Sequence, residues 1–213
     1  MPKDLKIGIL AIQGDYEAHA RMLDRLGVKW IYVRQPEDLE GISGLILPGG
    51  ESTTHLKVMR EEGLWDALHE FHARGGALFG TCAGAILLAR EVLNPVQASL
   101  GFLNVKILRN GYGRQLASDV HESKTKLREE PLEMVFIRAP IIEEIGAGVR
   151  VLAEDAAHPV LVQQGRILAA TFHPELTNDP LVHQHFIEMV QGNGNKQSDH
   201  KHNHAAASGQ FVN

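Results

Sequence analysis

Cysteine is scarce in this sequence: Cys82 is the single one among 213 residues. One cysteine cannot form an intramolecular disulfide, and a cysteine-rich metal site is excluded. Long apolar runs are also lacking, because the longest uncharged apolar stretch, Ala77 to Ala89, is too short to span a bilayer. The apolar run Lys6 to Ile12 has the length of a strand and lacks the features of a signal peptide. These absences predict a cytoplasmic protein without a membrane-spanning segment.

The sequence also has no concentration of positive charge. Its 21 Lys and Arg residues and 26 Asp and Glu residues give a formal net charge of −5, which is spread along the chain. Without a basic stripe or a polybasic patch, neither nucleic acid nor a membrane surface is an expected partner. An apolar fraction of 44% is instead typical of a globular protein with a sizeable core.

The length fits one domain better than two. From Gln191 onward the composition changes to Gly, Asn, Lys, His and Ala, so we expect a single domain over residues 1–191 and a disordered tail over residues 192–213. The tail contains His200, His202 and His204, but no fixed geometry is expected to hold them as metal ligands.

The first half of the chain alternates between predicted strands and predicted helices. Strands are expected at 6–12, 29–33, 44–47 and 77–80, and helices at 16–26, in two segments between 52 and 74, and at 85–92. Ser52 or Thr53 is the expected cap of the helix after the third strand. This alternation predicts an α/β fold with a mostly parallel central sheet flanked by helices on both faces.

The second half is richer in strands. We expect them at 103–108, 133–137, 149–153, 160–164 and 167–172, with a hairpin at Gln164-Gly165 and a closing helix over 179–190. These segments add antiparallel strands to the sheet. In open α/β sheets, ligands bind beyond the carboxyl ends of the strands. Three such ends carry unusual residues, namely Gln13-Gly14, Gly49-Gly50-Glu51 and Cys82-Ala83-Gly84.

Cys82 lies in Gly80-Thr81-Cys82-Ala83-Gly84, a G-x-C-x-G pattern between a strand and a helix. This is the cysteine form of a nucleophile elbow, a sharp turn that needs small flanking residues. The sulfur is then expected over the start of the following helix, where a thiolate is favoured, and the Ala83 N–H can stabilise an oxyanion. A tight turn with a merely packed cysteine would carry the same pattern, so the elbow needs a base.

Among the 12 histidines, His173 is the candidate base. It follows the last apolar strand and precedes Pro174 and Glu175. In extended geometry, Glu175 would point to the same side as His173, so its carboxylate can bind one imidazole nitrogen while the other faces a thiol. The remaining histidines have simpler interpretations: His19, His69 and His72 are expected on partly exposed helix faces, and His183 and His185 lie in the last helix.

The Cys82 elbow together with the distant His-x-Glu pattern resembles the class I (triad) glutamine amidotransferases. Leu47-Pro48-Gly49-Gly50-Glu51 is similar to the oxyanion loop of that family, where glycine lets a backbone N–H turn toward the oxyanion. The resemblance implies a flavodoxin-like fold of the class I type. A phosphate-binding loop is excluded, because no Gly-Lys-Ser/Thr follows.

Further motifs resemble one branch of this family, the glutaminase subunits of pyridoxal 5′-phosphate synthase. The resemblance covers residues 5 to 190. The motifs that carry it are Ala11-Ile12-Gln13-Gly14, Pro48-Gly49-Gly50-Glu51-Ser52-Thr53-Thr54, Phe79-Gly80-Thr81-Cys82-Ala83-Gly84, Arg109-Asn110-Gly111-Tyr112-Gly113-Arg114-Gln115, Phe136-Ile137-Arg138-Ala139-Pro140 and Phe172-His173-Pro174-Glu175-Leu176-Thr177.

The resemblance implies an activity and residue roles. The implied catalytic triad is Cys82, His173 and Glu175, which would hydrolyse L-glutamine to glutamate and ammonia through a thioester without a cofactor or metal. Implied glutamine-binding positions are Gly50, Glu51, Ser52, Arg109, Ile137 and Arg138. The implied oxyanion hole uses Gly49, Gly50 and Ala83, and Gln13 is implied to lie near it and near a partner interface. The implied partner is a synthase subunit with a (β/α)8 barrel, which receives the ammonia for vitamin B6 biosynthesis within a large hetero-oligomer.

Three alternatives remain open on the sequence. The same elbow would serve a cysteine peptidase or a γ-glutamyl hydrolase, and these would act without a partner. A glutaminase of another pathway, such as imidazole, purine or chorismate synthesis, would share the triad. A non-catalytic binding subunit is disfavoured because the cysteine, histidine and glutamate are all present.

Overall fold

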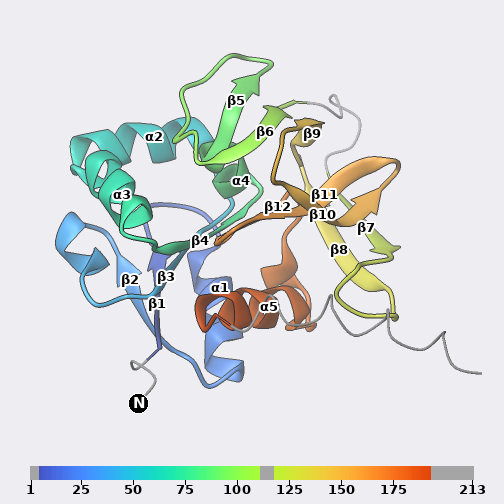
Figure 1. Cartoon of the computed structure of the whole chain (residues 1–213), viewed down its shortest axis with the longest axis horizontal. Coiled ribbons are helices and arrows are strands. Elements are labelled where there is room, and N and C mark those ends of the chain that lie inside the picture. The colour runs from blue at the N-terminus through green and yellow to red at the C-terminus, as the bar shows by residue number, and fades with distance from the viewer. Residues whose placement is uncertain (1–4, 111–117, 193–213) are drawn as a thin grey trace, which may run out of the picture.

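The computed structural model describes residues 5–110 and 118–192 (Figure 1). The first half forms β1 (Lys6–Leu10), α1 (Tyr16–Arg25), β2 (Lys29–Val33), a 3-10 helix (Pro36–Leu39), β3 (Gly44–Leu47), α2 (Ser52–Glu61), α3 (Leu64–Ala73), β4 (Ala77–Thr81) and α4 (Ala83–Leu88). The second half forms β5 (Ala89–Leu93), β6 (Leu103–Leu108), β7 (Ser118–Ser123), β8 (Leu132–Ile137), β9 (Ile141–Ile145), β10 (Arg150–Asp155), β11 (His158–Gln164), β12 (Ile167–Ala170), a second 3-10 helix (Pro174–Leu176) and α5 (Leu181–Val190). The expected tail lies, except for Gly192, outside the described residues.

The central sheet has seven strands in the order β10-β11-β12-β4-β3-β1-β2. The strands from β12 to β2 run parallel, and β11 and β10 are added as antiparallel strands. The parallel part therefore has the order of a doubly wound sheet, which reverses direction between β1 and β3. This confirms the predicted fold class. It also places the loops after β1, β3, β4 and β12 at one edge of the sheet.

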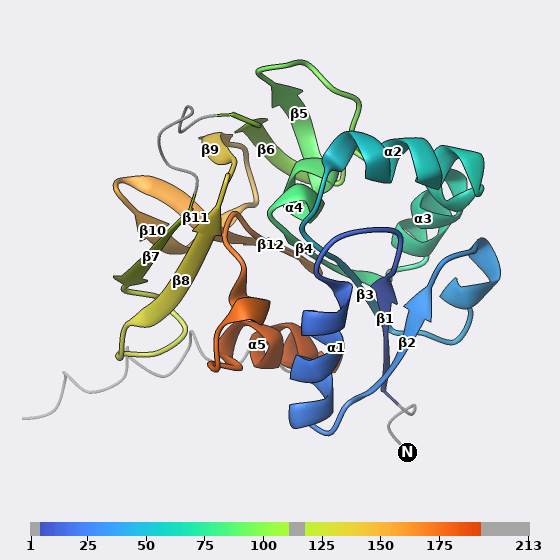
Figure 2. The ribbon, with the colours of Figure 1, turned by 180° about the vertical axis from the view of Figure 1, so that it is seen from behind.

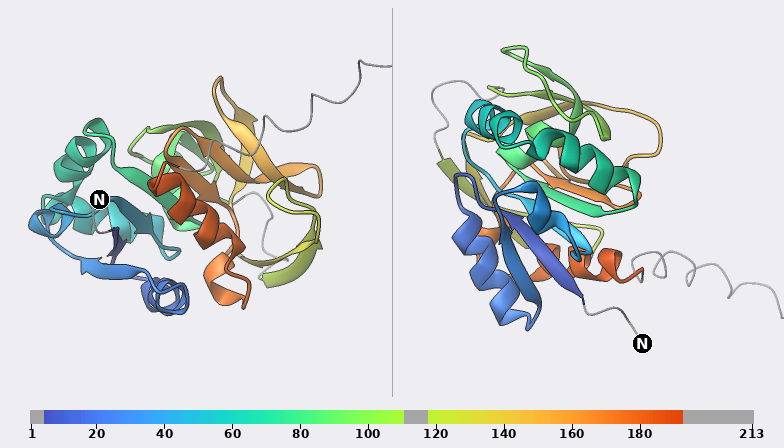
Figure 3. Two further views of the ribbon diagram at one scale, coloured as in Figure 1. Left: turned by 60° about the horizontal axis from the view of Figure 1, so that its bottom comes forward. Right: turned by 90° about the vertical axis from the view of Figure 1, so that its left-hand side faces the viewer.

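Helices cover both faces of the sheet (Figure 3). On one face α2, α3 and α4 bury a cluster that includes Leu56, Leu68 and Leu87, and on the other α1 and α5 bury a cluster that includes Leu23 and Phe186. The strands between them alternate their side chains between the two clusters, as a sheet buried on both faces requires. Among the described residues, none of the helices has the length and the apolar character needed to cross a membrane.

The smaller sheets lie at the end of the molecule away from β2 (Figure 2). β5, β6 and β9 form a three-stranded sheet, and β7 pairs with β8 as an antiparallel ribbon. The predicted hairpin at Gln164-Gly165 is confirmed, because β11 and β12 pair across it and Gly165 has a φ of +54°. β5, β7 and β9 were not predicted.

Three wrong expectations about element boundaries concern the segments around the predicted site. The helix expected over 85–92 covers Ala83–Leu88 and is followed by β5. The cap of α2 is Glu51, whose carboxylate accepts from the Thr53 N–H, and neither Ser52 nor Thr53 fills this position. β12 ends at Ala170, so His173 lies in the segment after the strand.

Candidate active site

Cys82 lies between β4 and α4 with a φ of 47° and a ψ of −103°. This is a strained conformation for a residue with a side chain, and it fits the predicted elbow. Two backbone bonds hold the turn: the Cys82 N–H donates to the Ala170 carbonyl of β12, and the Ile86 N–H donates to the Cys82 carbonyl. Neighbouring glycines are needed, because a Cβ on Gly84 would lie 1.9 Å from the Leu47 oxygen. Cys82 is 7% exposed, and its sulfur lies 3.8 Å from the Ile137 carbonyl oxygen.

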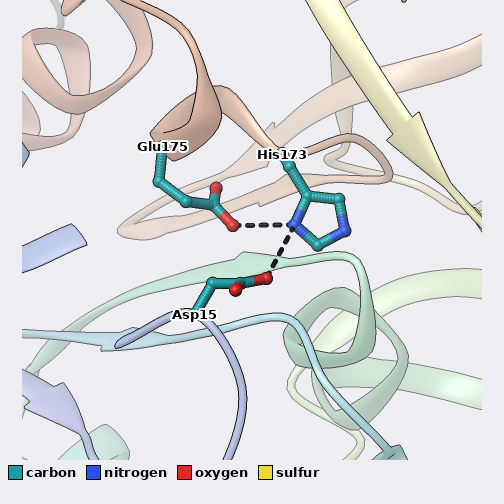
Figure 4. Close-up of side chains that lie close together, drawn as sticks. All are labelled: Asp15, His173 and Glu175. Atoms are coloured by element: carbon teal, nitrogen blue, oxygen red, sulfur yellow. Dashed lines mark hydrogen bonds and ion pairs between the residues drawn. The ribbon is translucent and has the colours of Figure 1, made fainter. Parts of the chain in front are cut away.

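His173 is fixed through its backbone and through its ring. Its N–H donates to the Val135 carbonyl of β8, and its Nδ1 lies 2.7 Å from Glu175 Oε1 (Figure 4). The predicted pairing is therefore present, but the expected extended geometry is wrong. Residues Pro174–Leu176 form a 3-10 turn, and this turn brings the Glu175 carboxylate back onto the ring.

Electrostatics favour a charged His173. Burial by itself lowers its pKa, but interactions with Cys82 and with Glu175 outweigh burial and raise the pKa of His173 to about 10. Burial raises the pKa of Glu175, whose side chain is fully enclosed, while the contact with His173 opposes that change. The contacts of the ring with Cys82 and with Glu175 thus favour the imidazolium form of His173.

The loop after β3 packs directly against the His173 ring. A Cβ on Gly49 would lie 2.4 Å from His173 Cε1, so this position needs glycine. The Gly49 N–H donates to the Thr81 hydroxyl at 3.1 Å, and the Gly49 carbonyl lies against Gly14. Because the Gly49 N–H is already donated to Thr81, Gly50 is the residue of this loop whose N–H remains for the predicted oxyanion hole. Gly50 lines the pocket. Its N–H points away from Gly14, because the trans peptide between Gly49 and Gly50 opposes this N–H to the Gly49 carbonyl that lies against Gly14.

Most of the predicted site residues line one pocket of about 160 Å³. Cys82, His173 and Ala83 line it together with every position that the resemblance assigns to glutamine. Its lining consists of Asp15, Gly50, Glu51, Ser52, Cys82, Ala83, Ile86, Arg109, Asn110, Ile137, Arg138 and His173. The motif continuing from Asn110 falls at residues 111–117, outside the described part of the chain.

Charged groups of both signs lie opposite the nucleophile. Arg109 donates to Glu51 Oε1 at 2.9 Å. Burial raises the pKa of Glu51, but bonds from Thr53 and the charges of Arg109 and Arg138 outweigh it and lower the pKa overall. Glu51 is therefore an anion beside two cations, which matches a ligand that carries an ammonium and a carboxylate on one carbon.

The comparisons with known proteins agree with this geometry. The model of the SNO glutamine amidotransferase family matches residues 9–192. The chain belongs to the SNO glutamine amidotransferase family.

Relatives of this amidotransferase share close to half of its sequence. It is 52% identical over 191 residues to the pyridoxal 5′-phosphate synthase subunit PdxT of Koribacter versatilis, covering 90% of this chain and 98% of that protein. A solved glutamine amidotransferase is 47% identical, with a TM-score of 0.82 over 86% of this chain and 98% of that chain. The structure of PurLQS from Thermotoga maritima is 18% identical, with a TM-score of 0.61 over 90% of this chain and 97% of that chain, and shares the fold.

Gln13 of the amidotransferase does not line the pocket but supports its wall. Its side-chain oxygen accepts from the Glu51 N–H at 3.0 Å, and its backbone oxygen lies 3.0 Å from His55 Nε2. Gln13 therefore joins the loop after β1 to the loop that carries Gly50 and Glu51. The expectation that Gln13 lies close to the oxyanion loop is consistent with these contacts.

Sequence reasoning missed two side chains near the triad of the amidotransferase. Asp15 Oδ2 lies 3.8 Å from His173 Nδ1, next to the contact with Glu175 (Figure 4). The position of Asp15 directly after the predicted Gln13-Gly14 loop could have suggested it. His19 was expected on a partly exposed face, but it is fully buried, with Nε2 3.2 Å from Thr81 Oγ1 and 3.5 Å from Glu175 Oε2. No local pattern indicates that burial.

In the part of the chain that the structure describes, the group of side chains with the spacing of metal ligands overlaps the triad. Among the described residues, Asp15, His173 and Glu175 form the group whose ligand atoms lie within 4.8 Å of one another. The Nδ1 of His173 in this group is already bound to Glu175. A larger cavity of about 700 Å³ lies at the opposite edge of the sheet, next to Ser43, Gly76 and Arg166, and contains no cysteine or histidine.

Proposed function

We propose that this chain is the glutaminase subunit of a pyridoxal 5′-phosphate synthase. It hydrolyses L-glutamine to L-glutamate and ammonia, and it delivers the ammonia to a synthase subunit with a (β/α)8 barrel in a hetero-oligomeric complex. Relatives that are 48% to 52% identical, among them the Koribacter versatilis protein described above, are named as subunits of that synthase. Family membership and near-complete coverage of these relatives support the assignment to this pathway rather than to another amidotransferase.

One observation carries the catalytic proposal: Cys82 and His173 line one pocket, and Glu175 lies on the far nitrogen of the ring. Cysteine nucleophiles need a base in reach and a group that orients the base. Here 91 residues separate Cys82 from His173 in the sequence. Their convergence, with a buried carboxylate behind the histidine, supports acyl transfer through a thioester.

In the proposed first step, the Cys82 thiolate attacks the side-chain amide carbon of glutamine. A C–S bond forms, and the amide oxygen becomes an oxyanion. The Ala83 N–H at the start of α4 lacks an intrahelical partner and, with the Gly50 N–H, is the proposed donor to this oxyanion. His173 then donates a proton to the amide nitrogen, the C–N bond breaks, and ammonia leaves behind a glutamyl thioester.

In the proposed second step, the thioester is hydrolysed. Neutral His173 accepts a proton from water, and the resulting hydroxide attacks the thioester carbon. The tetrahedral intermediate releases glutamate and returns sulfur as a thiolate beside the protonated imidazole. Glu175 keeps Nδ1 protonated throughout, so that Nε2 is the nitrogen that exchanges protons.

Substrate recognition in this proposal depends on Glu51, Arg109 and Arg138. Glu51 binds the α-ammonium of glutamine, and the two arginines bind its α-carboxylate. The remaining contacts come from Ser52 and from the backbone around Ile137. A volume of about 160 Å³ is smaller than the roughly 300–1,000 Å³ of sites for drug-sized ligands, and it suits one amino acid. A peptide would need a longer groove, which disfavours the cysteine peptidase alternative.

Gln13 is the proposed point at which the partner acts. Its bond to the Glu51 N–H ties the loop after β1 to the loop that holds Gly50. A synthase subunit that contacts the β1 loop would therefore change the position of the proposed oxyanion donor.

The test combines the purified protein with a pyridoxal 5′-phosphate synthase barrel subunit and measures glutamate release from glutamine. We expect turnover with the partner, little without it, and none for Cys82→Ala with the partner. Retained turnover in Cys82→Ala would remove Cys82 from the mechanism. Cleavage of γ-glutamyl peptides by the isolated protein would instead favour a γ-glutamyl hydrolase.

A further inference from the structure

A second pair of histidines lies buried behind the triad. His19 on α1 and His183 on α5 are both fully buried, and His19 Nδ1 lies 2.8 Å from His183 Nε2. The other nitrogen of His19 lies between Thr81 Oγ1 at 3.2 Å and Glu175 Oε2 at 3.5 Å. Neither histidine lines the pocket, so neither takes part in the chemistry proposed above.

Glu175 has a buried oxygen that His19 of this pair can bind. Its Oε1 is bound to His173, but its Oε2 is fully buried and has no hydrogen-bond partner in the described part of the chain. A buried carboxylate oxygen without a donor is costly and favours the protonated acid. His19 Nε2 is the nitrogen beside this oxygen, and a small shift of either side chain would complete the bond.

The hydrogen-bond pattern selects one tautomer of His19. If Nδ1 of His19 carried the hydrogen, His183 would have to accept it at Nε2 and would keep a hydrogen on its own Nδ1. That Nδ1 is buried without a partner among the described residues, and a buried donor without an acceptor is strongly disfavoured. The alternative has His183 donating from Nε2 to His19 Nδ1, which leaves the hydrogen of His19 on Nε2, facing Glu175 and Thr81.

Both rings are held neutral. Burial, followed by the influence of His183 and His173, sets the pKa of His19 well below its usual value. Burial and then the charge of Arg25 lower the pKa of His183 to about 3. His19 therefore offers Glu175 a hydrogen without adding a charge that would compete with His173 for the carboxylate.

We propose that His19 is a positioning residue of the triad, which donates from Nε2 to Glu175 and is fixed in that tautomer by His183. The Thr81 hydroxyl, which also lies beside His19 Nε2, accepts a hydrogen bond from the Gly49 N–H. One buried network thus joins the group behind the base to the loop that carries the proposed oxyanion donor. This inference rests on the proposed glutaminase function.

The kinetic test compares His19→Leu, which removes the donor, with His19→Gln, which restores an N–H near the position of Nε2. With the synthase partner present, we expect His19→Leu to lower kcat about 5- to 100-fold with little change in KM, and His19→Gln to recover most of it. His185→Leu is the matched control, because His185 lies on α5 and is bound to Gln163. Equal losses in His19→Leu and His19→Gln would contradict the proposal.

The pH dependence of kcat/KM distinguishes a positioning role of His19 from a purely structural one. Glu175 is faced by His173, Asp15 and His19, and of these only His19 acts as a neutral donor. Loss of that donor disfavours the ionised carboxylate, so the pKa of Glu175 rises. The acidic limb of kcat/KM should therefore move to higher pH in His19→Leu and return in His19→Gln. An unchanged limb would overturn the proposal.

A spectroscopic measurement needs neither turnover nor a variant. In protein with ¹⁵N-labelled histidine rings, nuclear magnetic resonance should find His19 neutral and protonated at Nε2 from about pH 5 to 9. A hydrogen on Nδ1 would overturn the inference even if the wild-type protein hydrolyses glutamine. Absence of turnover in the wild-type complex, with the expected tautomer present, would instead contradict the proposed function and leave the His19–Glu175 contact supported.

Discussion

His173 lies between two carboxylates and a sulfur, and these neighbours set its charge. Glu175→Gln keeps the size of the side chain but removes the nearer negative charge, so the pKa of His173 should fall from about 10. The amide of the new glutamine side chain can also donate to Nδ1 of His173, which would fix the imidazole in the wrong tautomer. We expect kcat to fall by about 10²-fold or more with KM nearly unchanged. Steady-state kinetics of glutamate release with the synthase partner would measure both constants.

Asp15→Asn is the control for Glu175→Gln. Its carboxylate lies 3.8 Å from the same nitrogen but is half exposed, so solvent weakens its influence. We expect a much smaller fall in kcat. If Asp15→Asn and Glu175→Gln lowered kcat equally, the assignment of Glu175 as the orienting carboxylate would be wrong.

Adding one methyl group at Gly49 should lower the activity and leave the fold intact. Its Cβ would lie 2.4 Å from His173 Cε1, so Gly49→Ala must displace the imidazole. Displacement of a catalytic group by about 1 Å costs roughly 10²-fold in rate. We expect kcat/KM to fall by about that factor while circular dichroism retains the wild-type spectrum. A fully active Gly49→Ala variant would contradict the observed ring position.

At the scale of single residues, the sequence predicted the side chains that local motifs mark. Cys82 stands in a G-x-C-x-G turn, and His173 and Glu175 follow the end of a strand. Each pattern alone left a simpler interpretation open, and the resemblance to the amidotransferases joined them into a predicted triad. The burial of His19 could not be predicted, because it depends on His183, which lies 164 residues away. Thr81 stands at an unspecified position of the G-x-C-x-G pattern, yet its hydroxyl accepts the Gly49 N–H.

The turn between β4 and α4 stores backbone strain at Cys82. Its φ of 47° and ψ of −103° are available to glycine but strained for residues with a Cβ, by about 1–3 kcal/mol. Cys82→Gly and Cys82→Ala both remove the sulfur, but Cys82→Ala alone keeps the Cβ. We therefore expect Cys82→Gly to be the more stable of the two by about 1 kcal/mol in urea unfolding. Higher stability of Cys82→Ala would show that the turn is not strained.

At the scale of elements, the prediction succeeded where an apolar run had a clear stop. β2, β3 and β6 have the predicted bounds. The segment 85–92 was predicted wrongly because a short apolar run suits a buried helix and a buried strand equally well. β7 was missed because its sequence is polar, and its pairing with β8 is a contact between distant segments.

At the scale of the whole molecule, we expect the buried histidines to make the folded state less stable in acid. The pKa of His183 is about 3 in the folded state and near 6.5 when the chain unfolds. Its contribution to stability is complete above pH 6.5 and is lost as the pH falls toward 3, by up to about 1.4 kcal/mol per pH unit. We expect His183→Leu to reduce this slope, as measured by urea unfolding between pH 4 and 7.

His185→Leu serves as the comparison for this slope. His185 lies on the same helix, but it is only partly buried and is bound to Gln163. Burial also lowers the pKa of His185, followed by the charge of Arg150, so its removal should reduce the slope less than removal of His183. An identical slope in wild type and His183→Leu would contradict the lowered pKa.

The fold class followed from the alternation of strands and helices, which predicted a mostly parallel sheet with both faces covered. The position of the site followed as well, since the loops after β1, β3, β4 and β12 meet at one edge. The sequence predicted that antiparallel strands are added to the sheet, as β10 and β11 are. It did not predict the separate three-stranded sheet of β5, β6 and β9. Strand pairing between distant segments leaves no periodic signal in a single sequence.

The single thiol of this chain allows the pocket to be labelled selectively. Any reagent that is selective for thiols must react at Cys82, because the sequence offers no other thiol. A chromogenic disulfide reagent would therefore count competent pockets in a preparation, one equivalent for each intact chain. Glutamine added beforehand should slow the colour change, and the degree of protection would report occupancy without any assay of ammonia.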